Sequence, residues 1–436
     1  MRFFANIAMA LLATLMLVAC GRSDASDATT GMAEARGVTI TRCDGYTIVE
    51  VANPWRKGEV LHTYILVPRY ANAAPNPTKA EANVAQSHTE AEANVAQSHT
   101  EAEANVAQSQ NKAAADAAPN QSQTKAEAVA AAGSEELPLP EGLPDGTVVR
   151  VPIERAVVYS SVHAGVMKEL GSFSAVRGVC DAQYYTMPEV QSGLDDGSIA
   201  DCGNSLSPTI ERLVALKPDA IILSPFQNAG YGVLTNLGVP IIECADYMEH
   251  TPLGRAEWIK LFGELLCCRE KADSIFQATA DEYSALTALT ATVEHRPKVI
   301  SEMITSGVWF VPGGDSYMAH LFTDAGASYP WSDDTNSGSL SLDFSQVLAR
   351  AQDADFWLIK PDRRLSYRDF EAINPLNVKF SAFSHRGVYQ CVTSETSLFT
   401  DFPFHPQVLL RDFVAIFHPE LLPDYMPRYY QPLSND

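Results

Sequence analysis

The sequence predicts an α/β protein built from two lobes, each with a mostly parallel sheet, joined by a long bridging helix. Its 436 residues exceed the length at which a single hydrophobic core usually stops growing, so two lobes are expected. Short apolar strands alternate with helices on both sides of a helical stretch at 251–295. Such alternation is typical of a parallel sheet covered on both faces, and the helical stretch is long enough to connect two such lobes.

The composition indicates a folded, acidic protein without a nucleic-acid partner. Apolar residues make up 46% of the chain, and 53 acidic against 31 basic side chains give a formal net charge of -22. Nucleic-acid binding needs clustered Lys and Arg to displace counterions, so this excess of acid disfavours it. Seven cysteines follow Cys20, and an odd number leaves at least one free or intermolecular. The absence of a C-x-x-C pair argues against structural zinc.

The N-terminus has the features of a secretory signal. Arg2 precedes an apolar run at 5–19, which is shorter than the roughly 20 residues that a membrane-spanning helix needs. The run ends in small residues before Cys20, as a cleaved signal does. The segment resembles a bacterial lipoprotein signal, which implies cleavage after residue 19 and a lipid on Cys20. The small, polar residues up to 35 then form a flexible tether, and the protein is expected on the periplasmic or cell-envelope side of a membrane.

The first lobe is predicted over 36–250. Residues 40–51 and 61–69 are read as two strands of a hairpin around Asn53. At about 71–136 the chain carries a low-complexity insertion with the unit EANVAQSHTEA at 81–91 and again at 92–102. Each unit offers one Val and several Ala, which is too little apolar surface to bury, so no chemistry is expected there.

The rest of the chain alternates between strands and helices. In the first lobe we predict strands within 148–161 and at 176–181, 219–224 and 239–245, and helices at 164–173, 211–218 and 231–238. Thr251 and Pro252 fit the cap and first position of the bridging helices, with a break near Arg269. The second lobe, 296–436, is predicted to have strands at 297–304 and 354–360 and helices at 316–326, 343–352 and within 406–419.

Two such lobes place a ligand cleft between the carboxyl ends of their sheets. The loops expected at this cleft are aromatic with scattered polar groups, which suits a bulky, partly planar ligand better than a bare ion. The candidate ligand-binding residues in these loops are Ser160, Ser161, His163, Pro225, Phe226, Gln227, Asn228, Tyr247, Glu302, Trp309, Phe310, Gly313, Gly314, Tyr317 and Trp331. For His163 two roles stay open, a contact to ligand or metal and a cap of its own helix.

Four motifs together resemble a known family. They are VVYSSVHAGVMKELGSFSAVRGVCD, IERLVALKPDAIILSPF, GVPIIECADYMEHTPLGRAEW and WFVPGGDSYMAHLFTDAGASYP. In their order and spacing they are similar to the class III periplasmic solute-binding lipoproteins of ATP-driven importers for ferric siderophores, haem and cobalamin. The resemblance implies two Rossmann-like lobes and a monomer that delivers its metal chelate to an ABC permease and its ATPase subunits.

The resemblance also implies roles for individual residues. A glutamate on each lobe of the family docks on the permease, and Glu211 matches the first position. At the second position stands Ser345, so Asp343 is the nearest candidate. Ser205 and Ser339 fall where some cobalamin-binding relatives present tryptophan. Two serines there argue for a more polar or differently shaped chelate.

Three functions are compared. The leading one is capture of an iron-siderophore or related chelate, without catalysis or a cofactor. The second is direct binding of zinc or manganese, for which the plausible ligands are His163, Glu302, Asp315 and His320. The third is an extracytoplasmic hydrolase. It is disfavoured because neither SPFQN nor YSSVH forms a G-x-S-x-G elbow, and VPGGDS lacks the spacing of a phosphate-binding loop.

Overall fold

The computed structural model describes residues 32–71, 136–227 and 230–435. Contacts divide the chain into two units, residues 1–67 with 140–436 and residues 68–139. In the second unit, Arg69 forms an ion pair with Glu136 at 3.0 Å. The predicted signal, Cys20 and the repeat units at 81–102 lie outside the described residues. Within the described ranges, no helix has the length and apolar character needed to cross a membrane.

The described chain begins with an antiparallel sheet in the order β1-β2-β3-β4. Its strands are β1 (Val38–Cys43), β2 (Tyr46–Ala52), β3 (Val60–Pro68) and β4 (Thr147–Val151). The predicted hairpin around Asn53 joins β2 to β3. The predicted single strand at 40–51 is wrong, because Asp44 and Gly45 form a tight turn between β1 and β2. Gly45 has a φ of 81°, which suits glycine in such a hairpin turn.

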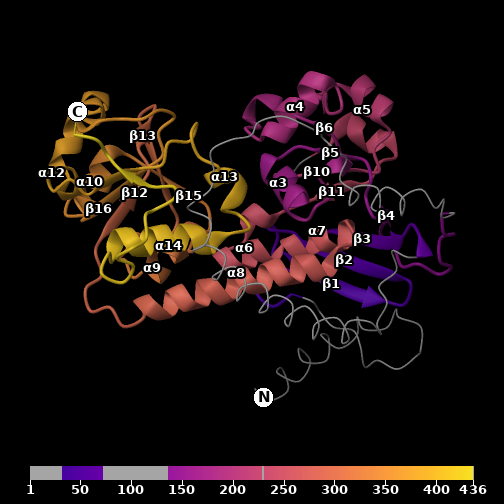
Figure 1. Ribbon diagram of the computed structural model, residues 1–436, viewed down its shortest axis with the longest axis horizontal. Coiled ribbons are helices and arrows are strands. Elements are labelled where there is room, and N and C mark those ends of the chain that lie inside the picture. Colours follow the sequence, from indigo (N-terminus) through magenta and orange to yellow (C-terminus); the bar gives the residue numbers. More distant parts are fainter. Residues whose placement is uncertain (1–31, 72–135, 228–229, 436) are drawn as a thin grey trace, which may run out of the picture. The chain divides into compact units, whose positions relative to one another are not determined.

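The N-terminal lobe contains the predicted parallel sheet, in the order β11-β10-β5-β6-β7 (Figure 1). Its strands are β5 (Ala156–Val158), β6 (Val176–Val179), β7 (Ala200–Asp201), β10 (Ala220–Leu223) and β11 (Ile241–Glu243). All four residues of β10 are buried, as expected for a strand covered on both faces. A short antiparallel pair joins β8 (Gly203–Asn204) to β9 (Ser207–Pro208).

Helices connect the strands of this lobe. They are α3 (Ser161–Glu169), α4 (Pro188–Asp196) and α5 (Ile210–Leu216), with the 3-10 helices η2 (Phe173–Ala175), η3 (Ala182–Tyr184), η4 (Gly232–Leu237) and η5 (Asp246–Met248). The segment predicted as a helix at 231–238 is therefore a 3-10 helix. Its six residues end at Leu237, and the following Gly238, with a φ of 67°, closes the helix.

Three helices form the bridge, namely α6 (Pro252–Glu257), α7 (Ile259–Leu265) and α8 (Arg269–Thr290). Thr251 caps α6 as predicted, because its hydroxyl accepts a hydrogen bond from the Gly254 amide at 3.0 Å. Helix α8 belongs to two hydrophobic cores. Ala272 and Phe276 are buried in the core of the N-terminal lobe, whereas Tyr283 and Leu286 are buried in that of the C-terminal lobe.

The C-terminal lobe has a second sheet in the order β12-β16-β17-β18. Strands β12 (Val299–Ser301), β16 (Phe356–Ile359) and β17 (Val388–Gln390) are parallel, and β18 (Gln431–Pro432) is antiparallel. A separate antiparallel sheet, which the sequence did not predict, contains β13 (Ile304–Thr305), β14 (Val308–Pro312) and β15 (Ser339–Leu342).

The helices of this lobe include the three that were predicted, α9, α10 and α14. The full set is α9 (Tyr317–Asp324), α10 (Phe344–Ala351), α11 (Tyr367–Ile373), η6 (Pro375–Lys379), α12 (Ser381–Ser384), α13 (Leu398–Asp401) and α14 (Pro406–Phe417). In the core between them, the indoles of Trp309 and Trp357 stack with their ring centroids 5.3 Å apart.

Two buried carboxylates hold residues 33–37 against the bridge. Glu257, which is 0% exposed, accepts hydrogen bonds from the backbone amides of Ala33, Glu34 and Ala35. Glu249 accepts from the next two amides, at 3.0 and 2.7 Å. Five consecutive backbone donors thus end on two carboxylates, and this arrangement fixes the first described residues to α6 and the loop before it.

Candidate ligand-binding site

The carboxyl edge of the N-terminal sheet carries a cavity of about 190 Å³. Several predicted ligand residues meet here, although they are far apart in sequence. The lining includes Ser160 after β5, Ser205 between β8 and β9, and Phe226 after β10. Tyr159 also contributes, and burial raises the pKa of its phenol, so the hydroxyl stays neutral.

Other predicted residues support this edge or flank it. The hydroxyl of Tyr247 donates to the carbonyl oxygen of Pro225 at 2.5 Å, which fixes the loop that carries Phe226. Ser161 begins α3, and Gln227 is exposed next to the cavity loop. Asn228 lies outside the described residues.

His163 lies in the core and does not cap α3, because the helix has no side-chain cap hydrogen bond. Its side chain is 1% exposed, and Nε2 lies 3.1 Å from Oδ1 of Asp246. Arg255 donates to the other carboxylate oxygen at 3.2 Å. Burial alone would raise the pKa of Asp246, but the hydrogen bond with His163 and the charge of Arg255 hold it below its ordinary value. This buried network joins α3 to the start of the bridge.

At the C-terminal sheet, Glu302 directly follows β12 and forms an ion pair with Lys360, which directly follows β16. The predicted residue Trp309 does not reach an open surface. It is 0% exposed, and its indole N–H donates to the carbonyl of Ser301 at 3.0 Å. Phe310, the next residue of β14, points the other way and is 49% exposed, because successive side chains of a strand alternate between faces.

The remaining predicted residues of the second lobe are dispersed. Gly313 and Gly314 are enclosed by the backbone of 331–338, and a side chain at either position would collide with its carbonyl oxygens. The requirement for glycine at both positions therefore has a packing cause. Tyr317 begins α9 with the guanidinium of Arg255 5.0 Å from its ring centre. Trp331 is buried, and Ser339 is exposed at the start of β15.

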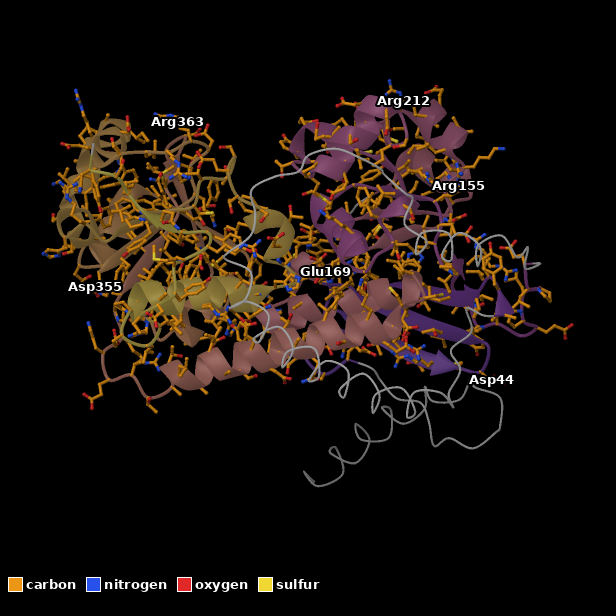
Figure 2. The ribbon with its side chains drawn as sticks, in the orientation of Figure 1. Asp44, Arg155, Glu169, Arg212, Asp355 and Arg363 are labelled. Carbon is orange, nitrogen blue, oxygen red and sulfur yellow. The ribbon has the colours of Figure 1, made fainter. Side chains whose placement is uncertain are left out.

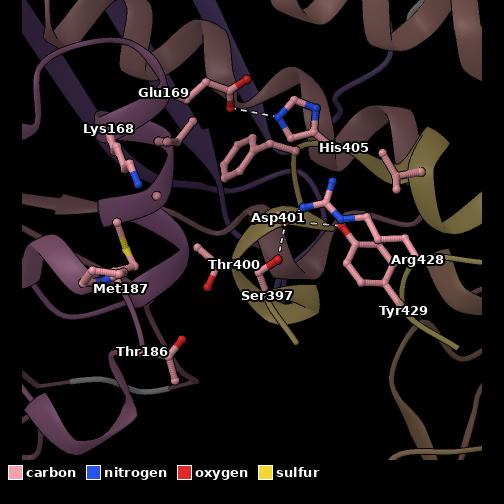
Figure 3. Close-up of a pocket in the computed structure, with 15 residues that line it drawn as sticks. Lys168, Glu169, Thr186, Met187, Ser397, Thr400, Asp401, His405, Arg428 and Tyr429 are labelled. Atoms are coloured by element: carbon pink, nitrogen blue, oxygen red, sulfur yellow. Dashed lines mark hydrogen bonds and ion pairs between the residues drawn. The ribbon is translucent and has the colours of Figure 1, made fainter. Parts of the chain in front are cut away.

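A larger cavity, of about 550 Å³, lies between the lobes at residues that the sequence reading did not select (Figure 3). Helix α3 and the start of α4 line one side, and α13 with the start of α14 line the other. At one end His405 Nε2 lies 2.8 Å from Glu169 Oε2. On the other side Arg428 donates to Asp401 at 2.8 Å. The pattern of 397–405 has no clear period, so its short helix and its position were not predictable.

The two candidate docking residues are both exposed. Glu211 lies in the first turn of α5, where a carboxylate is favoured by the helix dipole. Asp343 caps α10, since it accepts a hydrogen bond from the Gln346 amide at 2.9 Å and another from the hydroxyl of Ser345 at 2.6 Å. Asp343 therefore already has a structural role in this lobe.

The four residues considered as ligands of a bare metal ion do not converge. His163 contacts Asp246, and Glu302 contacts Lys360. Asp315 lies between His250 and His320, at 2.8 and 3.3 Å. Across the described residues, no group of three or more His, Cys, Asp or Glu side chains has an arrangement that could hold a metal ion.

Comparison with known proteins agrees with this architecture. Residues 157–391 match the model of the periplasmic binding protein family. Two uncharacterized lipoproteins of Methanocaldococcus jannaschii are similar. One is 26% identical over 63% of this chain and 67% of its own length, and the other is 25% identical over 66% and 76%.

Among solved structures, a TroA-like periplasmic binding protein, FepB, from Veillonella parvula superposes with a TM-score of 0.51 at 14% identity, covering 69% of this chain and 98% of that one. Another periplasmic binding protein from Veillonella parvula gives a TM-score of 0.50 at 16% identity, covering 65% and 97%. At these identities the likeness concerns the fold.

Proposed function

Since the chain belongs to the periplasmic binding protein family, we propose that it is the substrate-binding component of an ABC importer and captures an iron-siderophore or a related metal chelate outside the cytoplasm. Family membership supports a substrate-binding role. The choice of a chelate rests on the motif resemblance and on two exposed aromatic side chains, Phe226 and Phe310.

The observation that carries this choice is an exposed aromatic ring on each lobe. Phe226, at the N-terminal cavity, is 50% exposed, and Phe310 of β14 is 49% exposed. Large apolar rings exposed beside polar groups are typical of surfaces that bind a partly planar ligand. The dispersed carboxylates and histidines favour such a chelate over a bare ion.

Titration of the purified chain with haem, cobalamin and several ferric siderophores, followed by tryptophan fluorescence, tests the proposal. At least one chelate is expected to bind, and Phe226→Ala should weaken it. Val233→Ala is the matched control, because Val233 is similarly exposed, at 57%, but does not line the cavity. No response to any chelate, together with tightly bound zinc or manganese, would overturn the proposal.

We further propose that Cys20 carries a lipid that anchors the protein to the membrane. The N-terminal motif and the lipoprotein names of the two archaeal relatives support this. Metabolic labelling with a radioactive fatty acid should mark the wild-type chain and the control Cys43→Ser, but not Cys20→Ser. Labelling of Cys20→Ser would contradict a lipid on this residue.

A further inference from the structure

The second-lobe sheet brings one cation and one carboxylate together at its carboxyl edge. The first residues after the parallel strands β12, β16 and β17 are Glu302, Lys360 and Cys391. Because the three strands are neighbours in the order β12-β16-β17, these residues lie at one edge. Ligands of open α/β sheets bind outside this edge.

Lys360 is charged although it is largely enclosed. The side chains of Lys360 and Glu302 are 18% and 26% exposed. Burial lowers the pKa of Lys360, but the charge and hydrogen bond of Glu302 outweigh burial and raise it above its ordinary value. Burial also raises the pKa of the Cys391 thiol to about 12, so that group is neutral. The ammonium is therefore paired with the carboxylate of Glu302 at this edge.

The backbone at Glu302 is held in an unfavourable conformation. Its φ is 69°, in the left-handed region that residues other than glycine rarely adopt. Hydrogen bonds from two buried indoles to the backbone carbonyls of residues 301 and 302 hold this conformation in place. Trp309 donates to the carbonyl of Ser301 at 3.0 Å, and Trp357 donates to the carbonyl of Glu302 at 2.8 Å. Backbone conformations that are strained in this way, and held by the surrounding structure, are found most often at ligand-binding and active sites.

The ammonium retains donors for a ligand. A lysine has three N–H donors, and among the described contacts of Lys360 the polar partner is Glu302. Two more cations, Arg363 and Arg364, follow within four residues and are exposed, with Arg363 labelled on this lobe in Figure 2. Arg364 forms an ion pair with Glu395, and Asp362 offsets one of the remaining charges, so Lys360 and Arg363 leave a small local excess of positive charge. In a chain of net charge -22, this cationic segment is a local exception that favours anions.

We propose that Lys360 binds an anionic group of the transported chelate, and that Glu302 positions the ammonium for it. The inference rests on the proposed function and narrows the cargo to chelates that carry a carboxylate or a comparable anionic oxygen group. Electrostatic pairing with a partly desolvated ammonium gives such a ligand an advantage over an uncharged one.

The test compares anionic and uncharged probes. Ferric citrate and haem carry carboxylates, whereas a neutral ferric trihydroxamate has no free anionic oxygen group. Lys360→Met should weaken binding of the anionic probe by about 10- to 100-fold, the range of a hydrogen bond to a charged group. Binding of an uncharged probe should not change. Lys379→Met is the matched control, because Lys379 is an exposed lysine of the same lobe.

Lys360→Met leaves the carboxylate of Glu302 without its partner, so a second variant guards against misfolding. The double variant Glu302→Gln/Lys360→Met removes both charges and should show the same loss for the anionic probe. Glu302→Gln alone keeps the cation and should retain the preference for that probe.

The outcomes separate the two proposals. Chelate binding without a preference for anionic probes, or a preference that survives in both Lys360 variants, overturns the inference and leaves the proposed function intact. Failure of every probe to bind overturns the proposed function, and the role of Lys360 with it.

Discussion

Replacement of Glu257 should destabilise the protein more than replacement of any exposed glutamate. The carboxylate is 0% exposed. It accepts backbone hydrogen bonds at 2.9, 2.7 and 2.8 Å from residues 33–35, and one at 2.7 Å from Lys260 Nζ. In Glu257→Gln one carbonyl oxygen remains as an acceptor, but the amide group turns a donor toward these donors. The side-chain amide N–H of the glutamine then faces backbone N–H groups, so more than one of these hydrogen bonds is lost.

The size of the effect follows from these contacts. Each hydrogen bond to a charged group contributes about 1.5–3 kcal/mol, and removing one partner of a buried ion pair costs about 3–5 kcal/mol. These terms overlap because they share one carboxylate. We therefore expect Glu257→Gln to lower the free energy of unfolding by about 3 kcal/mol.

Urea denaturation, followed by circular dichroism on the chain without residues 1–19, measures this loss. The control is Glu294→Gln at an exposed position, which should stay within about 0.5 kcal/mol of wild type. The slope of the transition should not change, so the shift in midpoint reports stability. A loss below about 1 kcal/mol for Glu257→Gln would refute the reasoning, since it would mean that these bonds contribute no more than an average surface contact.

Three further outcomes are expected. Burial raises the pKa of Glu257, but its hydrogen bonds outweigh burial and leave the pKa below the ordinary 4.5. The stabilisation by this carboxylate is therefore complete above pH 4.5 and is lost as the pH falls through the lower pKa of the folded state. In a plot of unfolding free energy against pH, Glu257→Gln should remove this loss at acid pH. Glu211→Lys should reduce ligand uptake by cells while leaving affinity unchanged, unlike the exposed control Glu270→Lys, and normal uptake would remove Glu211 from docking. Gly313→Ala should cost about 1–3 kcal/mol in thermal or urea unfolding, because its methyl group meets the carbonyl of Asn336, and a neutral result would show that the loop yields.

The sequence predicted the parallel sheet of the N-terminal lobe and the long bridging helix because both have a strong local pattern. The run at 220–223 is apolar throughout, and α8 repeats apolar residues at helical spacing. The turn at Asp44 and Gly45 has a local signal as well, since an Asp-Gly pair between apolar runs is typical of a hairpin.

The site was harder to predict because it depends on which face a side chain occupies. Trp309 and Phe310 are neighbours of similar character, yet one is buried and the other exposed, and only the register of β14 with β15 decides which. Lys360 has no local signature either. Its relation to Glu302 arises from the pairing of β12 with β16, strands that are more than fifty residues apart.

Helix α8 has a consequence for how the protein melts. Phe276 and Tyr283 are two turns apart, about 10 Å along the axis, yet they serve different cores. If either lobe unfolds, half of α8 loses the side chains that pack against it. A short helix without such packing is only marginally stable in water, so the exposed half is expected to unfold as well. We therefore expect the two lobes to unfold together on heating, in one cooperative transition, because α8 is part of a core in each lobe.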